Sequence, residues 1–285
     1  MRLSVLGAGY LGAIHATCMA HLGHEVKVYD VNLERVSLLA KGIPPFFEPG
    51  FRELLETTLA TGRLLFTDSA EEAIRGAAMH FICVGTPQQQ GADAADLRYV
   101  DSAFQMIVAN ADCDSTIVGK STVPVGTAQR LANAIPIEGA VARLELAWNP
   151  EFLREGTAIE DTLRPDRLVF GVEFQESERG LMEVYGRLLS DGIPYITTDL
   201  ATSEMVKVAA NSFLATKISF INAMAEICEV ANADVVTLSR ALGYDERIGA
   251  RFLHAGLGFG GGCLPKDIRA FSARGSFALA SSSTV

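Results

Sequence analysis

The stretch "RLSVLGAGYLG" at the start of the chain restricts the possible folds more than any other feature. A short apolar run, Arg2 to Leu6, leads into Gly7, Gly9 and Gly12 in G-x-G-x-x-G spacing, and then into a helical pattern from Tyr10 to about Leu22. In such a strand–turn–helix unit the first glycine makes the tight turn and the second lets the backbone approach a pyrophosphate, while the third lets the helix pack closely on the strand. The stretch therefore predicts a phosphate-binding turn at a helix N-terminus.

A carboxylate follows at the spacing that such a turn requires. A second strand-like run, "EVKVYD", ends in Asp30, where the side chain would accept hydrogen bonds from the ribose of a dinucleotide. An acid at this position favours NAD, because the 2′-phosphate of NADP would meet a like charge. Arg35 leaves the NADP alternative open, because an arginine can pair with a phosphate. We expect NAD as the cofactor.

The pattern of strands and helices then continues. Helical runs near 33–41 and 51–61, a strand at 64–66, a short helix after Ser69 and the strand "HFICVGTP" alternate in the order expected of a parallel sheet. The predicted fold class is α/β, with an N-terminal doubly wound, Rossmann-like sheet.

Polar residues stand where two of these strands end. Gly85, Thr86 and Pro87 follow one, and Ser121 and Thr122 follow the strand in "TIVGKSTVPVGT". Open parallel sheets bind ligands at this edge, so these five residues are candidate cofactor contacts. The alternative is that the threonines only terminate strands and cap helices.

A different pattern begins after residue 150. From about Thr202 to Ala231 the sequence predicts one long helix in a mainly helical region. Lys207 and Asn211 are four residues apart on one of its faces, although a solvated surface pair would have the same spacing. Glu151 and Glu155 could equally form an exposed helix edge. The predicted buried side of the long helix consists of Met205, Val208, Ala209, Phe213, Ile218, Ile221 and Ile227.

Composition excludes several classes of function. The 285 residues suffice for two domains, and 24 basic against 34 acidic residues give a net charge of −10, which argues against nucleic acid as a partner. No apolar run is long enough for a membrane span and no leader pattern is visible, so we expect a cytoplasmic protein. Five cysteines without a C-x-x-C pair suggest neither disulfides nor a metal site, and Cys18, Cys83, Cys113 and Cys228 are expected to be small core residues.

The fifth cysteine has a different setting, "GFGGGCLPKD". Its glycines allow a backbone that approaches a ligand closely, and Pro265 suits the first turn of a helix. A helix N-terminus and the neighbouring Lys266 would both lower the pKa of the Cys263 thiol. Cys263 is therefore a candidate nucleophile, the alternative being a small residue in a glycine hinge.

Together these segments resemble the nucleotide-sugar dehydrogenases, in particular those that act on UDP-glucose. The resemblance runs from Met1 to about Phe271 and rests on "GAGYLG", "VGTP", "KSTVPVGT", "NPEFLREGTAIEDTLRPDRLVFG", "EMVKVAANSFLATKISFINAMAEIC", "DERIGARFL" and "GFGGGCLPKDIRAF". It implies oxidation of UDP-glucose to UDP-glucuronate with two NAD molecules in succession, through a thiohemiacetal and a thioester on Cys263.

The resemblance also implies roles for individual residues. Lys207 and Asn211 would stabilise an anionic oxygen, Asp267 and Thr122 would hold water or assist proton transfer, and Glu151 would act as general acid or base. Arg247 would reach the substrate of a partner subunit. Further cofactor contacts would come from Tyr10, Leu11, Glu155 and Lys266, and further substrate contacts from Phe152, Leu153, Phe259 and Gly260.

The same resemblance implies a domain organisation. We expect an NAD-binding domain at 1–198, a central helical domain with the cysteine loop at 199–271 that forms a homodimer through the long helix, and a non-family tail at 272–285. The family's second Rossmann-like domain is not recognisable in "SARGSFALASSSTV", so we expect a truncated form with reduced or no activity.

Three alternatives stay open at this point. The sugar could be that of GDP-mannose or UDP-N-acetylmannosamine, whose dehydrogenases share the cysteine loop. A hydroxyisobutyrate-type dehydrogenase would perform one oxidation and need no cysteine. The chain could also be a non-catalytic NAD-binding or dimerisation module.

Overall fold

The computed structural model describes residues 1–89, 91, 94–136, 141–258, 264–265 and 268–269. The chain divides into two compact units. The first consists of Met1–Thr86 and Asp96–Met205, and the second of Pro87–Ala95 and Val206–Val285.

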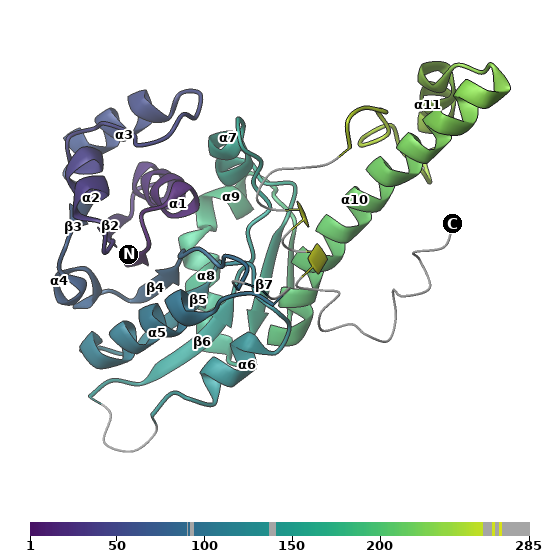
Figure 1. Cartoon of the computed structure of the whole chain (residues 1–285). Helices are drawn as coiled ribbons and strands as arrows, with labels where there is room; N and C mark the ends of the chain where they lie inside the picture. Colours follow the sequence, from purple (N-terminus) through teal and green to yellow (C-terminus); the bar gives the residue numbers. More distant parts are fainter. Residues whose placement is uncertain (90, 92–93, 137–140, 259–263, 266–267, 270–285) are drawn as a thin grey trace. The chain divides into compact units, whose positions relative to one another are not determined.

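The first unit is built on one mixed sheet (Figure 1). Among the described residues it has eight strands in the order β3-β2-β1-β4-β5-β6-β7-β8. Neighbouring strands are parallel except for β6 and β7, which are antiparallel. The strands are β1 Arg2–Leu6, β2 Glu25–Tyr29, β3 Leu64–Thr67, β4 Met79–Ile82, β5 Ser115–Gly119, β6 Leu144–Trp148, β7 Leu168–Val172 and β8 Tyr195–Thr198.

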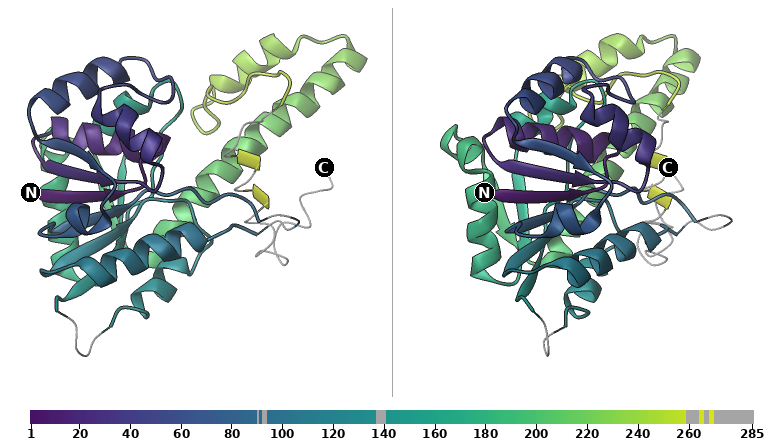
Figure 2. Two further views of the ribbon diagram at one scale, coloured as in Figure 1. Left: turned by 60° about the vertical axis from the view of Figure 1, so that its left-hand side comes forward. Right: turned by 90° about the vertical axis from the view of Figure 1, so that its left-hand side faces the viewer.

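Helices cover both faces of this sheet. One buried cluster joins the strands to α1, α2 and α3, and to α7, α8 and α9 further along the chain, while a second joins them to α4, α5 and α6. In Figure 2 the purple strands accordingly lie between α1 on one side and α5 on the other. The helices are α1 Tyr10–His21, α2 Leu33–Ala40, α3 Phe51–Ala60, α4 Ala70–Ile74, α5 Arg98–Asn110, α6 Thr127–Ala132, α7 Ala158–Leu163, α8 Gln175–Val184 and α9 Gly186–Ser190.

Because both faces are covered, the central strands β4 and β5 are buried along their length, including their polar residues His80, Ser115 and Thr116. The predicted α/β class with a Rossmann-like sheet is therefore confirmed. The predicted elements of the first 130 residues are also present, several within a residue of their expected bounds. The local signals are visible in the structure: the Asn32 side chain caps α2 by accepting from the N–H of Arg35, and Ser69 caps α4 through the N–H of Glu72.

The second unit contains most of α10 Leu200–Ala231, whose first residues belong to the first unit, and α11 Val235–Gly243. Asn232 ends α10 in a left-handed conformation with φ 52°, and the N–H of Ala233 closes back on the carbonyl of Cys228. The segment after α11 folds back along α10. There the Lys217 Nζ donates to the carbonyl oxygens of Ile248 at 2.9 Å and Gly249 at 3.2 Å.

The predicted long helix is present, but much of its predicted buried side is wrong. Val208 and Ile221 are buried and Ile218 is half-buried, whereas Phe213 is 65% and Ile227 57% exposed, and Met205 and Ala209 are also exposed. The helix has apolar residues around most of its circumference, so periodicity could not single out one face. The buried positions are Leu200, Ser203, Glu204, Lys207, Val208, Ala215, Ile221 and Cys228.

Candidate functional site

The glycine-rich turn shows why each glycine is needed. Gly7 has φ 101°, and a Cβ on it would lie 2.9 Å from the carbonyl oxygen of Cys83. A Cβ on Gly12 would lie 1.8 Å from the carbonyl oxygen of Gly7, because α1 rests directly on the turn. The tight turn predicted at Gly7 and the close helix packing predicted at Gly12 are both confirmed.

Gly9 differs from the other two, because a Cβ built on it would meet no atom within 4 Å. Gly9 is the N-cap of α1 and has an extended conformation. It has no side chain that could accept a hydrogen bond from the N–H groups of Tyr10, Leu11 and Gly12 in the first turn of the helix. Open space beside exposed helix N–H groups is the environment that a pyrophosphate requires. These residues therefore fit the diphosphate of a dinucleotide, and the contact itself stays a prediction.

Asp30 lies at the end of β2 and holds the turn in place. Its Oδ2 accepts from the N–H of Ala8 at 2.6 Å and from the Arg35 Nη1 at 3.0 Å, while its Oδ1 accepts from the N–H of Asn32 at 2.8 Å. Asp30 is buried, and Arg35 is paired to it as a salt bridge. The acid is thus placed beside the glycine turn, as the sequence led us to expect, and its bond to a ribose remains a prediction.

The ends of β4 and β5 are joined by their own polar side chains. The Ser121 hydroxyl donates to the carbonyl oxygen of Val84 at 2.6 Å, and the Thr86 hydroxyl donates to the carbonyl oxygen of Thr122 at 2.8 Å. Gly85 is exposed, with open space where a Cβ would stand. The structure brings these candidates together at the carboxyl edge of the sheet, where a dinucleotide in this fold lies. Pro87 belongs to the second unit.

The buried Lys120, which follows β5, holds the residue that follows β6. The Lys120 Nζ donates to the Asn149 Oδ1 at 2.9 Å, the same oxygen accepts from the Tyr185 hydroxyl at 2.6 Å, and the Asn149 amide nitrogen donates to the carbonyl oxygen of Val169. Burial raises the pKa of the Tyr185 hydroxyl, so it remains a donor. This network orders the segment that enters the loop with Glu151. Lys120 was not predicted as a site residue, because nothing local distinguishes it from a surface lysine.

The loop 149–157 holds the candidates Glu151, Phe152, Leu153 and Glu155. The Glu151 Oε2 accepts from the N–H of Leu153 at 2.8 Å, and the Arg167 guanidinium stacks on the Phe152 ring with 3.9 Å between its carbon and the ring centroid. Glu155 is exposed. Since α7 begins only at Ala158, the alternative of an exposed helix edge for the two glutamates is wrong.

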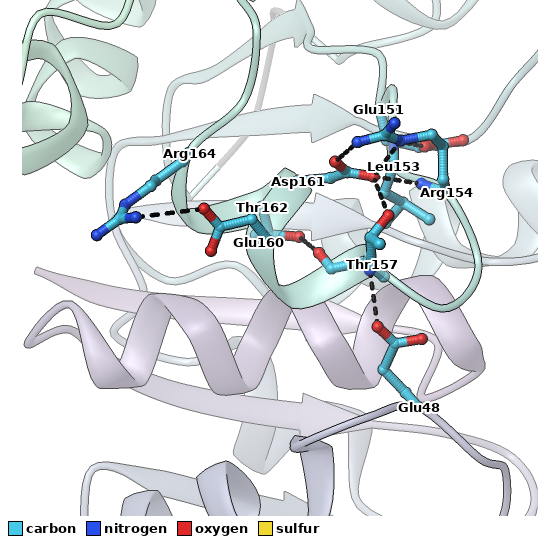
Figure 3. Close-up of polar contacts among 10 residues, drawn as sticks. Glu48, Glu151, Leu153, Arg154, Thr157, Glu160, Asp161, Thr162 and Arg164 are labelled. Carbon is cyan, nitrogen blue, oxygen red and sulfur yellow. Dashed lines mark hydrogen bonds and ion pairs between the residues drawn. The ribbon is translucent and has the colours of Figure 1, made fainter.

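One residue in this region was missed entirely. Glu48 is buried, and its Oε2 accepts from the Tyr10 hydroxyl at 2.5 Å and from the N–H of Gly156 at 2.8 Å. Its Oε1 accepts from the N–H of Ala158 at 2.7 Å. Figure 3 shows Glu48 at the beginning of α7, beside Thr157. The sequence around it, "FFEPG", indicates only a turn, so no local signal could have revealed these distant partners.

In the second unit, Lys207 and Asn211 lie one turn apart on α10. Lys207 is only 6% exposed, so the alternative of a solvated helix lysine is wrong, and Asn211 is half-buried. Arg247 is exposed and forms an ion pair with Asp245 at 2.6 Å. The remaining candidates, Phe259, Gly260, Cys263, Lys266 and Asp267, lie outside the described residues.

The other four cysteines lie among the described residues. Cys18, Cys83 and Cys228 are buried, as predicted, whereas Cys113 is only half-buried in the connection between α5 and β5, which corrects the expectation of a core position. Burial raises the pKa of Cys18 and of Cys83 to about 12, so neither thiol is ionised near neutral pH. Within the described part of the chain, no group of His, Cys, Asp and Glu side chains could hold a metal ion, and no helix is long and apolar enough to cross a membrane.

The comparison with protein families agrees with this geometry. Residues 1–189 match the NAD binding domain of the UDP-glucose/GDP-mannose dehydrogenase family, and residues 201–279 match its central domain. The chain belongs to the UDP-glucose/GDP-mannose dehydrogenase family. Its first unit therefore contains most of the NAD-binding domain of that family, all but Pro87–Ala95.

Individual members of the UDP-glucose/GDP-mannose dehydrogenase family are similar over nearly the whole chain. A UDP-glucose 6-dehydrogenase of Rhizobium meliloti is 44% identical over 269 residues, which are 94% of this chain and 62% of that protein. The structure of a UDP-glucose dehydrogenase from Pyrobaculum islandicum aligns with a TM-score of 0.91 at 42% identity, covering 96% of this chain and 64% of that one. A GDP-mannose dehydrogenase from Pseudomonas aeruginosa aligns with a TM-score of 0.81 at 32% identity, covering 97% and 64%. The chain thus spans less than two thirds of the length of these family members.

Proposed function

We propose that this chain takes part in the NAD-dependent oxidation of UDP-glucose to UDP-glucuronate. Two similar proteins, at 44% and 42% identity, are UDP-glucose dehydrogenases. The glycine turn, Asp30 and the ends of β4 and β5 provide a site that fits NAD. When bound, NAD supplies the acceptor for hydride from the sugar carbon. The residues of this chain hold the coenzyme, orient the sugar and manage the protons.

The observation that supports this proposal most directly is the burial of Lys207. We expect a buried ammonium on this family-matched helix to stabilise negative charge on a substrate oxygen, with the Asn211 amide one turn away as a second donor. Preorganised donors of this kind each contribute roughly 3 kcal/mol to transition-state stabilisation.

Two oxidations require a group that retains the sugar between them, and we propose Cys263 for this role. The primary alcohol first loses a hydride from carbon and a proton from oxygen to give an aldehyde. The Cys263 thiolate adds to the aldehyde carbon, and the resulting oxyanion takes up the proton released in the first oxidation to form a thiohemiacetal. The thiohemiacetal then loses a second hydride and a proton to give a thioester. Water then cleaves the thioester, releasing the carboxylate and restoring the thiol. Glu151, Thr122 and Asp267 would guide this water and its protons.

We further propose that the sugar lies against Phe152 and Leu153, together with Phe259 and Gly260, and that the active form is a homodimer through α10 in which Arg247 reaches the partner's substrate. The exposed apolar side chains of α10, Phe213 and Ile227 among them, support this interface. In the proposed homodimer, the second subunit would cover these side chains.

The experiment compares nucleotide sugars. The protein is incubated in excess over UDP-glucose, GDP-mannose or UDP-N-acetylmannosamine with saturating NAD, and NADH is followed to completion, so that slow turnover is still detected. We expect NADH with UDP-glucose and much less with the other two sugars. If NADH formed with GDP-mannose instead, GDP-mannose would replace UDP-glucose as the proposed substrate. The 32%-identical structure is that of a GDP-mannose dehydrogenase.

Variants test the residues. Lys207→Met should slow NADH formation by roughly 10² to 10³, whereas Lys41→Met, which removes an exposed lysine at the end of α2, should leave it unchanged. No NADH from any sugar, with NAD binding intact, would support the non-catalytic module and overturn the proposal.

A further inference from the structure

Glu48 joins two parts of the first unit that are far from it and from each other in the sequence. Tyr10 belongs to the coenzyme turn, Gly156 and Ala158 belong to the loop and helix that follow Glu151, and all three donate a hydrogen bond to this one buried carboxylate. Tyr10 is fixed from a second side, because its ring lies 4.9 Å from that of Phe46.

We propose that Glu48 is a positioning residue that transmits NAD binding at the glycine turn to the loop 151–158. Tyr10 is the first residue of α1, directly after Gly9, so a dinucleotide seated on this turn lies against its backbone. A change in the order of Tyr10 reaches the loop through Glu48 and through the Gly156 N–H, which also donates to the Tyr10 hydroxyl at 3.4 Å. Coupling of this kind acts equally in both directions. That the loop also contacts a sugar rests on the proposed function, but the link from coenzyme turn to loop does not.

The chemistry of the carboxylate explains why this residue must be glutamate. Both oxygens act as acceptors, Oε1 for Ala158 and Oε2 for Gly156 and Tyr10. A glutamine has one acceptor oxygen, and its amide nitrogen is itself a donor. In either orientation the Glu48→Gln side chain would turn a donor towards one backbone N–H of the loop. Burial and the nearby Glu48 carboxylate raise the pKa of the Tyr10 hydroxyl, which keeps it a donor at physiological pH.

The loop is otherwise held by interactions of its own. Arg154 forms an ion pair with Asp161 at 2.6 Å, and the Thr157 hydroxyl donates to the same carboxylate (Figure 3). These contacts lie within the loop and α7, so they can order the loop but cannot connect it to the coenzyme turn. Helix α1 also packs on α7, and the Gly156 N–H reaches the Tyr10 hydroxyl directly at 3.4 Å. Glu48 adds a buried carboxylate that binds the turn and two N–H groups of the loop and α7 at once, and we assign it the main part of the coupling.

The test is amide hydrogen exchange of the peptide 151–158, measured with and without saturating NAD and with no sugar present. In the parent protein NAD should slow exchange at Gly156 and Ala158. In Glu48→Gln these amides should exchange roughly tenfold faster or more, since each loses or weakens a charge-assisted bond, and NAD should no longer slow them. The matched control Glu53→Gln makes the same change at an exposed glutamate of α3 and should behave as the parent.

A second variant separates transmission from simple support of the loop. Tyr10→Phe removes the hydroxyl that meets Glu48, together with its long 3.4 Å contact to the Gly156 N–H, but leaves both loop N–H groups the Glu48 carboxylate as acceptor. The loop should therefore keep its protection without NAD and lose only the further slowing caused by NAD. If NAD slows loop exchange equally in Tyr10→Phe and in the parent, or in Glu48→Gln and in the parent, the proposal is overturned. Because the readout needs no sugar, failure of the sugar chemistry would leave this result unaffected.

Discussion

Adding one methyl group at Gly9, and separately at Gly12, distinguishes the site of coenzyme contact from the packing that supports it. At Gly12 the new Cβ would stand 1.8 Å from the carbonyl oxygen of Gly7, so α1 and the turn would have to separate by well over an ångström. Overpacking of this kind costs about 1–3 kcal/mol. We expect Gly12→Ala to lower the free energy of unfolding by at least that amount and to weaken NAD binding as a consequence.

At Gly9 the space around a Cβ is open, and the backbone conformation suits any residue, with φ −64°. Alanine is a poorer N-cap than glycine, at a cost of up to about 1 kcal/mol, while it restricts the unfolded chain and regains about 0.4–1 kcal/mol. These effects nearly cancel. Stability should therefore hardly change, whereas a methyl group in the space meant for a pyrophosphate should weaken NAD binding at least tenfold, or by about 1.4 kcal/mol.

The assays are urea unfolding for stability and isothermal titration calorimetry for NAD. We expect the two variants to behave differently. Gly9→Ala should fold with normal stability but bind NAD poorly, whereas Gly12→Ala should lose both stability and NAD affinity. A Gly9→Ala protein that binds NAD as tightly as the parent would show that the coenzyme does not approach this part of the turn.

Three further predictions concern buried groups. Burial lowers the pKa of His80 from 6.5 to about 4, so its stabilising effect is complete above pH 6.5 and is lost as the pH falls; urea unfolding should show a loss of about 2 kcal/mol at pH 5, and no loss would contradict the assignment. Glu204 accepts from two N–H groups at the start of α6, so Glu204→Gln should cost about 1.5–3 kcal/mol, and an unchanged unfolding midpoint would refute the capping role. In Gly119→Ala the added Cβ would stand 2.2 Å from the ring of Trp148, the only tryptophan of the chain, so the variant should be destabilised and its fluorescence shifted, and an unaltered spectrum would argue against this packing.

Local patterns were sufficient to predict the first half of the sheet. The glycine spacing, the side-chain caps at Asn32 and Ser69 and the apolar strands each act over a few residues, so they can be recognised without knowing the fold. The antiparallel step from β6 to β7 and the strand β8 were not predicted, since they depend on pairing between distant segments.

In the candidate site, too, residues with a local sequence signal were predicted, and residues with distant partners were not. Asp30 was found because it stands at a fixed distance from the glycine turn, whereas Glu48 and Lys120 were missed, because their partners lie up to 110 residues away. The buried face of α10 was misjudged for a related reason: a helix that is apolar around most of its circumference does not reveal which side is covered.

The most direct test of the account is the number of NADH molecules formed per molecule of UDP-glucose when the protein is in excess and the reaction runs to completion. The account predicts two for the parent protein and no more than one for Cys263→Ser, with NAD binding retained in both. One NADH per sugar from the parent protein would contradict the two-step oxidation through a cysteine thioester.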